Sequence, residues 1–556
     1  MPVEPSAPGY ATHEVLNQAG PFEAYNAFAG DLPLHEATRV FGADWAAEHL
    51  SRTGALIGST RLQLLARQAN RYVPELRTHD RFGNRIDEVE FHPAYHELMA
   101  LIFGSEEHSF AWTHPQPGAQ VARGVLSYLW NQGENGVCCP ASMTFAAIPP
   151  VKNDRALYAT MAPLILSSRY DPRPIPAEGK TGITVGMAMT EKQGGSDLRA
   201  TLTHARPAGS ARGPSAPYLL TGHKWFFSVP MSDLFLTLAR TESGISCFAA
   251  RGWLPDGARN RLKLQRLKEK CGNRSNASSE VEFYDLEATM LGEEGRGIRT
   301  IIGMAQLTRL DISFSAAGIM RQALSQAIHH TSHRRAFQRA LIDQPLMRAV
   351  LADLATESEA MIWLCMRVAW ALDRFASDPA EALLSRVCIP LAKYWTCKRA
   401  PGFIAEALDC HGGNGFIAEH PLERLYREAP LNGIWEGSAN VICLDVLRAM
   451  QQEPEAVGAF LDEVRRARGA DPRLDAAAAE LERSLTDLSQ FEGDARRLAE
   501  MMVNALQGSL LLRYSAPAVA DAFCSTRLAG GWGRVYGTLP HGCATQEIVD
   551  RARIVA

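Results

Sequence analysis

Residues 410–440 read CHGGNGFIAEHPLERLYREAPLNGIWEGSAN and carry the most specific pattern in the chain. They begin with a glycine-rich turn, continue through an arginine-containing segment at residues 424–427 and end around one carboxylate, Glu436. Glycine lets the backbone approach a ligand closely because it has no side chain. An acid between Trp435 and Gly437 can lie in an apolar pocket, which raises its pKa and suits it to proton abstraction. The alternative is an ordinary helix start with a solvated acid.

The composition is that of a large globular protein. At 556 residues the chain is too long for one ordinary domain and predicts three or four structural units. Hydrophobic residues make up 46% and charged residues 21%, which is enough apolar material for a sizeable core. The formal net charge of -4 gives no indication of nucleic-acid binding from bulk charge.

The cysteines and the N-terminus indicate a cytoplasmic protein. Eleven cysteines are scattered without a CxxC pair, which predicts reduced thiols rather than a disulfide framework. The first residues, MPVEPSAPGYATHEV, contain no basic region followed by an apolar run, so we expect no signal peptide. We also expect no membrane span, because an uninterrupted apolar run of roughly 20 residues is missing.

Changes in composition and periodicity divide the chain into five segments. Residues 1–40 are rich in Pro, Gly and Ala and predict an extended arm, whereas residues 41–180 show apolar positions at helical spacing. Short β-like runs separated by Pro and Gly fill residues 181–290 and predict a small β domain. Helical periodicity returns in residues 291–445, as a bundle, and continues in residues 446–556, as an added C-terminal helical domain. The predicted fold class is α+β, mainly α.

Two blocks in the β segment have the character of a ligand site. Residues 189–197, MTEKQGGSD, place Thr190 at the end of a strand, with Gly195 and Ser196 close behind. Backbone N–H groups and two hydroxyls in this arrangement suit an anion such as a pyrophosphate. An ordinary hairpin turn is the alternative. The second block is GHKWFFS at residues 222–228.

Two further polar features are interpreted as structural. Residues 131–136, NQGENG, predict a loop before a helix that begins near Cys138. His329 and His333 are spaced i, i+4, a spacing that can bind zinc, and His330 lies beside them. The HExxH glutamate and a third ligand are missing from the sequence here. We therefore predict no metal site.

The three blocks resemble, in order and in element type, the motifs of the acyl-CoA dehydrogenase family. In that family a glutamate takes a proton from the carbon alpha to a thioester while FAD receives hydride from the beta carbon. Glu436 matches this base by position. The resemblance implies a fold of helical domain, small β domain and helical bundle, with FAD as cofactor and an acyl-CoA thioester as substrate. Arg309 matches an arginine near the family's active site, although a surface helix charge is the simpler interpretation.

The resemblance also implies a set of flavin contacts. An aromatic and a hydroxyl residue lie against the flavin ring in the family, and Phe226 and Ser228 match them, with Phe where Trp is usual. The complete implied set within one chain is Met189, Thr190, Gly195, Ser196, Phe226, Phe227, Ser228, Ile434, Trp435 and Asn440. Arg334 begins an Arg-x-x-Phe pattern that resembles the motif by which one subunit grips its neighbour's FAD pyrophosphate, with Gln338 in place of the usual glycine. A homo-oligomer, commonly a tetramer, follows from that resemblance.

The dehydrogenase resemblance covers roughly residues 41 to 445, and a helical extension follows. Residues 446–556 carry 13 Arg and no Lys against 15 acidic residues. The arm, the extension and the wording of the blocks resemble the AidB-type branch, flavoproteins of the bacterial adaptive response to DNA alkylation. That branch binds double-stranded DNA through the C-terminal domain, which implies phosphate contacts at Arg448, Arg513 and Arg527; a structural ion pair is the alternative for each.

Three hypotheses remain open from the sequence. The first is a DNA-binding flavoprotein of the alkylation-damage response with a weak acyl-CoA dehydrogenase site. The second is a metabolic dehydrogenase of a short or branched acyl-CoA, whose extension serves oligomerisation. The third is a scaffold with a vestigial site.

Overall fold

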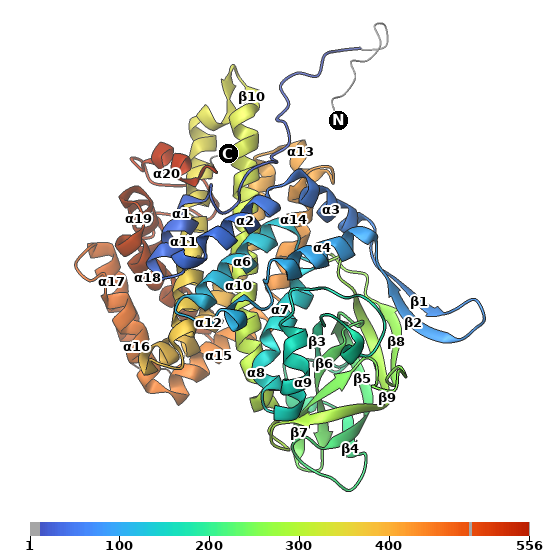
Figure 1. Cartoon of the computed structure of the whole chain (residues 1–556). Helices are drawn as coiled ribbons and strands as arrows, with labels where there is room; N and C mark the ends of the chain where they lie inside the picture. Colours follow the sequence, from blue (N-terminus) through green and yellow to red (C-terminus); the bar gives the residue numbers. More distant parts are fainter. Residues whose placement is uncertain (1–11, 487, 489–491, 555–556) are drawn as a thin grey trace.

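The computed structural model describes residues 12–486, 488 and 492–554. Three bodies are arranged around one long bundle: N-terminal helices across it, a β domain at one end and the C-terminal helices on the side away from the β domain (Figure 1). Short 3-10 or π turns join several elements, namely η1 (Asp44–Ala46), η2 (Ala177–Gly179), η3 (Leu198–Ala200), η4 (Leu341–Asp343) and η5 (Cys524–Leu528). Among the described residues, no helix combines the length and apolar character needed to cross a membrane.

The N-terminal part is helical with one projecting hairpin. Its helices are α1 (Leu32–Val40), α2 (Ala47–Ile57), α3 (Thr60–Arg71), α4 (Pro93–Gly104), α5 (Phe110–Thr113), α6 (Ala119–Gly133), α7 (Cys138–Ala146), α8 (Ile148–Val151) and α9 (Arg155–Ile165). Strands β1 (Glu75–His79) and β2 (Arg85–Glu90) form the antiparallel hairpin. Proline at the first position and a cap by the His92 side chain start α4 where the sequence predicts it.

The β domain is a sheet whose pairings close on themselves. Its strands are β3 (Val185–Ala188), β4 (His204–Pro207), β5 (Pro217–Ser228), β6 (Leu234–Thr241), β7 (Gly244–Arg251), β8 (Leu262–Leu267) and β9 (Ser278–Leu291). Strand β6 pairs with β4 and β7, while β5 and β9 complete the ring between them. Strand β3 adds to β6 and β8 adds to β9. Phenylalanines from four strands fill the interior: Phe227, Phe235, Phe248 and Phe283.

The bundle and the extension form the rest of the chain. The bundle comprises α10 (Gly297–His333), α11 (Pro345–Arg374), α12 (Pro379–Asp409), α13 (Gly413–Phe416), α14 (Pro421–Asn432) and α15 (Ala439–Gln452), with a small hairpin of β10 (Arg335–Ala336) and β11 (Arg339–Ala340). The extension comprises α16 (Pro454–Arg465), α17 (Pro472–Ser484), α18 (Ala495–Tyr514), α19 (Pro517–Phe523) and α20 (Thr545–Ala552). The extension shares one continuous apolar core with the bundle, so it is not a separately tethered module.

Two local predictions differ from the structure. The predicted arm is only partly extended, because its last nine residues form α1, capped by the buried Asp31, which also pairs with Arg321 at 2.8 Å; residues 1–11 of this prediction lie outside the described residues. The predicted loop at residues 131–136 begins with the last turn of α6. Burial explains the second difference, since Glu134 accepts hydrogen bonds from three buried groups rather than facing solvent.

Candidate active site

Glu436 lies in a tight turn between α14 and α15. Its φ is 55° and that of Gly437 is 108°, so two consecutive residues occupy the left-handed region. A side chain at Gly437 would place its Cβ 2.8 Å from a methyl carbon of Ile442. Glycine is therefore required after Glu436 for conformational and steric reasons together. The strained turn directs one acid away from the helices on either side.

Two cations from the bundle hold the backbone of this turn. The Nε of Arg309, on α10, donates to the carbonyl oxygen of Glu436 at 3.1 Å. The Nζ of Lys393, on α12, donates to the carbonyl oxygen of Gly437 at 2.5 Å. Arg309 also pairs with Asp445 at 2.7 Å. Arg309 is thus positioned beside Glu436, and the alternative of a free surface charge does not hold.

The Glu436 carboxylate has one side-chain hydrogen-bond donor and a raised pKa. Thr308 Oγ1 donates to its Oε2 at 3.0 Å. Removal from water raises the pKa of Glu436, while the Thr308 hydrogen bond and the charges of Arg309 and Lys393 act in the opposite direction. The side chain is half-buried. An acid whose pKa is raised in this way is suited to accepting a proton in a catalytic step.

The β domain provides the facing side of the site. Ser228 and Ser278 are cross-strand partners on β5 and β9, and their hydroxyl oxygens lie 3.3 Å apart. The buried thiol of Cys139, at the start of α7, adjoins Ser228 and is near enough to Glu436 to be influenced by its charge. Burial raises the pKa of Cys139 to about 12, and the charge of Glu436 adds to that effect. The Glu436 turn and the GHKWFFS block of the β domain therefore approach the same thiol.

The MTEKQGGSD block folds tightly on itself. A Cβ on Gly195 would lie 2.3 Å from Thr190 Oγ1, so glycine is needed there. Ser196 is exposed, and Met189 and Thr190 are half-buried. Glu191 holds the loop in place. Its buried carboxylate pairs with Lys224 at 2.8 Å and accepts hydrogen bonds from the backbone N–H groups of Leu202 and Thr203. Sequence reasoning missed the role of Glu191.

Of the two adjacent phenylalanines, one is exposed and the other is buried. Phe226 is 52% exposed, and the ammonium group of Lys268 lies 4.7 Å from the centre of its ring. Phe227 is fully buried in the β-domain core, with its ring centroid 4.9 Å from that of Phe235. The side chain of Phe227 therefore lies in the core of the β domain and not at the predicted flavin site, because successive side chains on a strand point to opposite faces.

The remaining residues of the base motif occupy different environments. Ile434 is 65% exposed, whereas Trp435 packs partly into the core and donates its indole N–H to Asn432 at 3.1 Å. Asn440, in the first turn of α15, accepts a hydrogen bond from Arg496 of α18 at 2.8 Å. The C-terminal extension therefore reaches the edge of the predicted flavin site.

A buried amide near Cys139 fits a bound polar heterocycle. Asn276 is 1% exposed, and neither its Oδ1 nor its Nδ2 has a hydrogen-bond partner among the described residues. It precedes β9 and adjoins the Cys139 thiol beside Ser228. A buried amide without partners is costly unless a ligand satisfies it. The residues present are therefore suited to a flavin ring with its several donors and acceptors. In the sequence, the only indication that Asn276 belongs to the site is its position just before a strand.

Arg334 lies at the end of the bundle farthest from the β domain, next to the hairpin of β10 and β11 (Figure 1). Its guanidinium donates to the carbonyl oxygen of Asn17 at 2.5 Å. At the hairpin tip Phe337 is 92% exposed with a φ of 49°, and Gln338 has a φ of 68°. Arg334 is thus not brought to the flavin block of its own chain.

Two of the three predicted DNA contacts are structural arginines, which corrects those predictions. Arg527 is 5% exposed and pairs with Asp353 at 2.6 Å and Glu357 at 3.1 Å. Arg513 pairs with Glu463 at 2.7 Å and is also largely buried. Both guanidiniums are committed because the extension packs its arginines against acids of the bundle and of α16. Arg448, by contrast, is exposed on α15 and has no ion-pair partner among the described residues.

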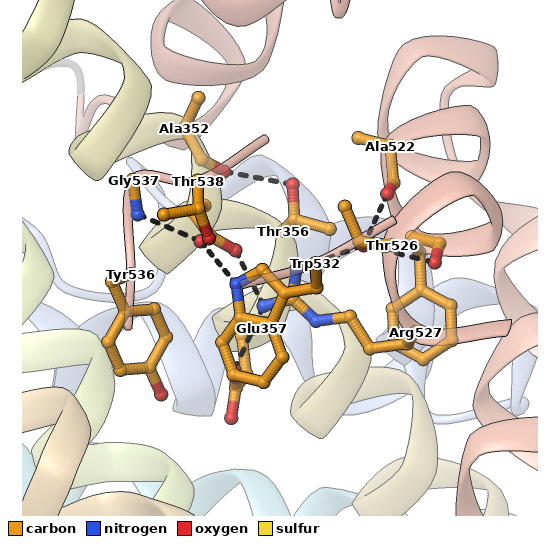
Figure 2. A network of polar contacts seen from close by, with 12 residues as sticks. Ala352, Thr356, Glu357, Ala522, Thr526, Arg527, Trp532, Tyr536, Gly537 and Thr538 are labelled. Atoms are coloured by element: carbon orange, nitrogen blue, oxygen red, sulfur yellow. Dashed lines mark hydrogen bonds and ion pairs between the residues drawn. The ribbon is translucent and has the colours of Figure 1, made fainter. Parts of the chain in front are cut away.

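The network around Arg527 joins the extension to α11 (Figure 2). The indole N–H of Trp532 and the backbone N–H of Gly537 each donate to Asp353 at 2.9 Å. The Arg527 guanidinium carbon lies 4.3 Å from the centre of the Trp532 ring. A cavity of about 180 Å³ lies next to this network. The charged groups of the network are largely paired with one another, so they hold the extension in place.

The histidine cluster has structural contacts. His329 contacts the carbonyl oxygen of Gly20 at 2.9 Å, and His333 contacts that of His329 at 2.8 Å. His330 packs against His411 with ring centroids 4.5 Å apart. Within the part of the chain that the structure describes, no three His, Cys, Asp or Glu side chains gather as metal ligands would.

Comparison with known proteins covers nearly the whole chain. Residues 17–172 match the family described as "Adaptive response protein AidB N-terminal domain". Residues 186–286 and 295–451 match the middle and C-terminal domains of acyl-CoA dehydrogenases. The chain is 42% identical over 521 residues to "Putative acyl-CoA dehydrogenase AidB" of Escherichia coli, covering 93% of this chain and 95% of the relative.

Solved structures share the fold. One is Caenorhabditis elegans ACDH-11 in complex with C11-CoA, with a TM-score of 0.84 and 23% identity over 94% of each chain. Another is the apo-form of a protein called Bd2924, with a TM-score of 0.81 and 28% identity, covering 90% of this chain and 99% of that one. The predicted fold class is confirmed.

With this architecture and these matches, the chain belongs to the acyl-CoA dehydrogenase family, and it is an FAD-dependent oxidoreductase by that membership. The predicted cofactor, FAD, is confirmed on the same ground. Within the family the chain is a member of the AidB-type branch, as the sequence blocks indicate.

Proposed function

We propose that this chain oxidises an acyl-CoA thioester at a site where Glu436 is the base and FAD lies against Ser228. The single observation that carries the proposal is the Glu436 turn, whose left-handed backbone presents a half-buried acid opposite the β-domain block. FAD, when bound, supplies the hydride acceptor. Arg309 and Lys393 hold the turn, Thr308 orients the carboxylate, and Asn276 and Ser228 contact the cofactor.

The test is acyl-CoA-dependent bleaching of the flavin in the variant Glu436→Gln. Loss of the base should slow bleaching by roughly 100- to 10,000-fold while FAD stays bound, because general-base catalysis contributes about that much. The amide keeps the size of the side chain, so the absorption spectrum of the oxidised flavin serves as the folding control. Bleaching at the wild-type rate would remove Glu436 from this role.

A second proposal is that the protein binds double-stranded DNA as part of a response to alkylation damage. It is supported by the match to the adaptive-response family and by exposed arginines of α15 and the extension that have no ion-pair partner among the described residues: Arg448, Arg468, Arg483 and Arg534. Phosphate contacts by arginine make affinity fall steeply with salt. The test is duplex binding across a salt series by the FAD-loaded protein. Salt-independent binding, or none at low salt, would contradict the proposal.

A third proposal is that the protein is a homo-oligomer, a tetramer as is common in its family, in which Arg334 serves the flavin of a neighbouring chain. It is supported by the distance of Arg334 from its own β domain and by the exposed Phe337 beside it. The test is the mass in solution of wild type and of Phe337→Asp. A wild-type monomer that retains FAD would contradict it.

A further inference from the structure

A half-buried lysine lies next to the flavin block and belongs to none of the predicted motifs. Lys270 stands in the segment between β8 and β9, and its Nζ donates to the carbonyl oxygen of Asn276 at 2.7 Å. The same Nζ donates to the hydroxyl of Ser278 at 3.1 Å. Ser278 is in turn 3.3 Å from Ser228, the hydroxyl predicted to face the flavin. Three side chains therefore form a continuous polar chain from a cation to the cofactor site.

The lysine favours one direction of hydrogen bonding along this chain. An ammonium group only donates, so Ser278 accepts from Lys270 and its own proton is available for Ser228. Ser228 can then direct its proton to a third group. The cross-strand pairing of Ser228 with Ser278 keeps the two hydroxyls in register. Every donor in the chain thus points away from Lys270 and toward the site.

The charge of Lys270 is not neutralised by a contacting carboxylate among the described residues. The ionisable groups that face it are Cys139 of α7, Glu134 after α6 and Glu428 of α14. Burial raises the pKa of Glu428 to about 7, and its carboxylate accepts the backbone N–H of Asn273 at 2.7 Å rather than contacting the lysine. Burial raises the pKa of Cys139 to about 12, so the thiol is neutral. Lys270 is therefore a source of positive potential at the site.

We propose that Lys270 acts on the bound flavin through Ser278 and Ser228 and favours the reduced state of the cofactor. Uptake of two electrons and one proton would leave the flavin ring system with one additional negative charge. A cation that is connected to the ring by aligned, hydrogen-bonded hydroxyl groups stabilises that added negative charge. The inference rests on the proposed position of FAD against Ser228, and it assigns Lys270 a tuning role that does not require contact with the substrate.

The test is a reductive titration of the FAD-loaded protein with dithionite and a reference dye. In Lys270→Met the ratio of reduced to oxidised flavin at a fixed potential should fall at least tenfold, which corresponds to about 30 mV for a two-electron couple. Ser278→Ala should have an effect of the same sign, because it interrupts the chain while leaving the lysine. The double variant should show less than the sum of the two effects.

Lys263→Met is the matched control. Lys263 lies on β8 with its Nζ 4.2 Å from the centre of the Tyr284 ring, so its loss removes one positive charge from the β domain outside the polar chain. An equal shift in Lys263→Met would overturn the proposal, and so would wild-type potentials in both Lys270→Met and Ser278→Ala. Release of FAD from both test variants would also overturn it, in favour of a role in holding the cofactor.

The pH dependence gives an independent check. Burial lowers the pKa of Lys270 to about 8, so its positive charge is present below that pH and is lost above it. The difference in potential between wild type and Lys270→Met should therefore shrink as the pH rises past about 8. A difference that is constant from pH 6 to pH 10 would overturn the charge-based role. These titrations use neither acyl-CoA nor DNA, so they remain interpretable if Glu436 is not the base, and wild-type protein that binds no FAD would instead refute the proposed function.

Discussion

The turn at Glu436 and the network at Arg527 use charge in opposite ways. At the turn, Arg309 and Lys393 donate to backbone carbonyls, and the carboxylate of Glu436 accepts only a neutral hydroxyl among the described side chains. At the network, Arg527 contacts two buried carboxylates directly. The first arrangement leaves an acid able to take a proton. In the second arrangement the charged groups are paired with one another, and the pairs hold the C-terminal extension against the bundle.

This difference explains why arginine content alone did not locate a DNA surface. A guanidinium that packs against buried acids has no free donors for phosphate, whatever the residue suggests in sequence. The same comparison indicates how the base remains reactive. Cations that act on the backbone fix its geometry without forming the ion pair that would strongly lower its pKa.

The largest effect is expected in the network, where the loss of Arg527 should lower the free energy of unfolding. Arg527→Met removes one side of a buried ion pair and leaves Asp353 without its cation, which costs roughly 3–5 kcal/mol in the free energy of unfolding. Urea unfolding followed by tryptophan fluorescence measures it, because Trp532 lies within the network. Wild-type stability of this variant would show that the network does not hold the extension.

The second-largest effect, on the rate of flavin bleaching, is expected from Lys393, which holds the backbone of the Glu436 turn. Lys393→Met leaves the Gly437 carbonyl without its donor and should slow flavin bleaching by roughly 10- to 100-fold, since small displacements of a catalytic group are costly. The charge of Lys393 also lowers the pKa of Glu436, so the acidic limb of the pH–rate profile should move to higher pH. Lys398→Met, on an exposed position of the same helix, is the control. An unchanged profile in Lys393→Met would contradict the role of the lysine in the turn.

Much of the fold could be predicted from sequence because periodicity is a local property. Strands β3 to β9 lie between Val185 and Leu291, with β5 across residues 222–228, and the extension is helical in α16, α17, α18, α19 and α20. The hairpin at residues 75–90 was missed. Its strands have weak alternation, and the end next to its turn is fixed by a long-range contact, the hydrogen bond from Arg85 to the carbonyl of Leu264.

The site was predictable only where a motif carries its own geometry. Glu436 and Gly437 are consecutive residues of one motif, and both have a positive φ in the turn between α14 and α15. Lys393, Asn276 and Lys270 approach the site from separate elements, and nothing in their local sequence indicates where they meet. The burial of the Phe227 side chain could not be read from the resemblance, which gives a position in the sequence, whereas the alternation along the strand decides which face a side chain occupies.

A smaller effect is expected from the hydroxyl that orients the base. Thr308→Val keeps the shape of the side chain and removes the hydrogen bond to Glu436, which lowers the pKa of that acid. The pKa should therefore rise further, and because the base acts when deprotonated, the acidic limb of the bleaching profile moves to higher pH. At pH values below that limb the rate should fall roughly 3- to 10-fold, in line with the loss of one hydrogen bond. Thr308→Ser restores the donor and should restore the profile.

The smallest effect on the fold is expected from Arg448. Its side chain is exposed without an ion-pair partner among the described residues, so Arg448→Glu should change the free energy of unfolding by less than about 0.5 kcal/mol. If Arg448 contacts a phosphate, the same substitution should lower the slope of log affinity against log salt by about 1 and weaken binding to all duplex sequences alike. The two measurements separate an effect on stability from an effect on DNA binding. A substitution of Arg527 cannot separate them, because it destabilises the extension before any effect on DNA binding can be measured. An unaltered salt slope in a fully folded Arg448→Glu protein would remove this arginine from the DNA surface and leave the other exposed arginines of the extension to be tested in the same way.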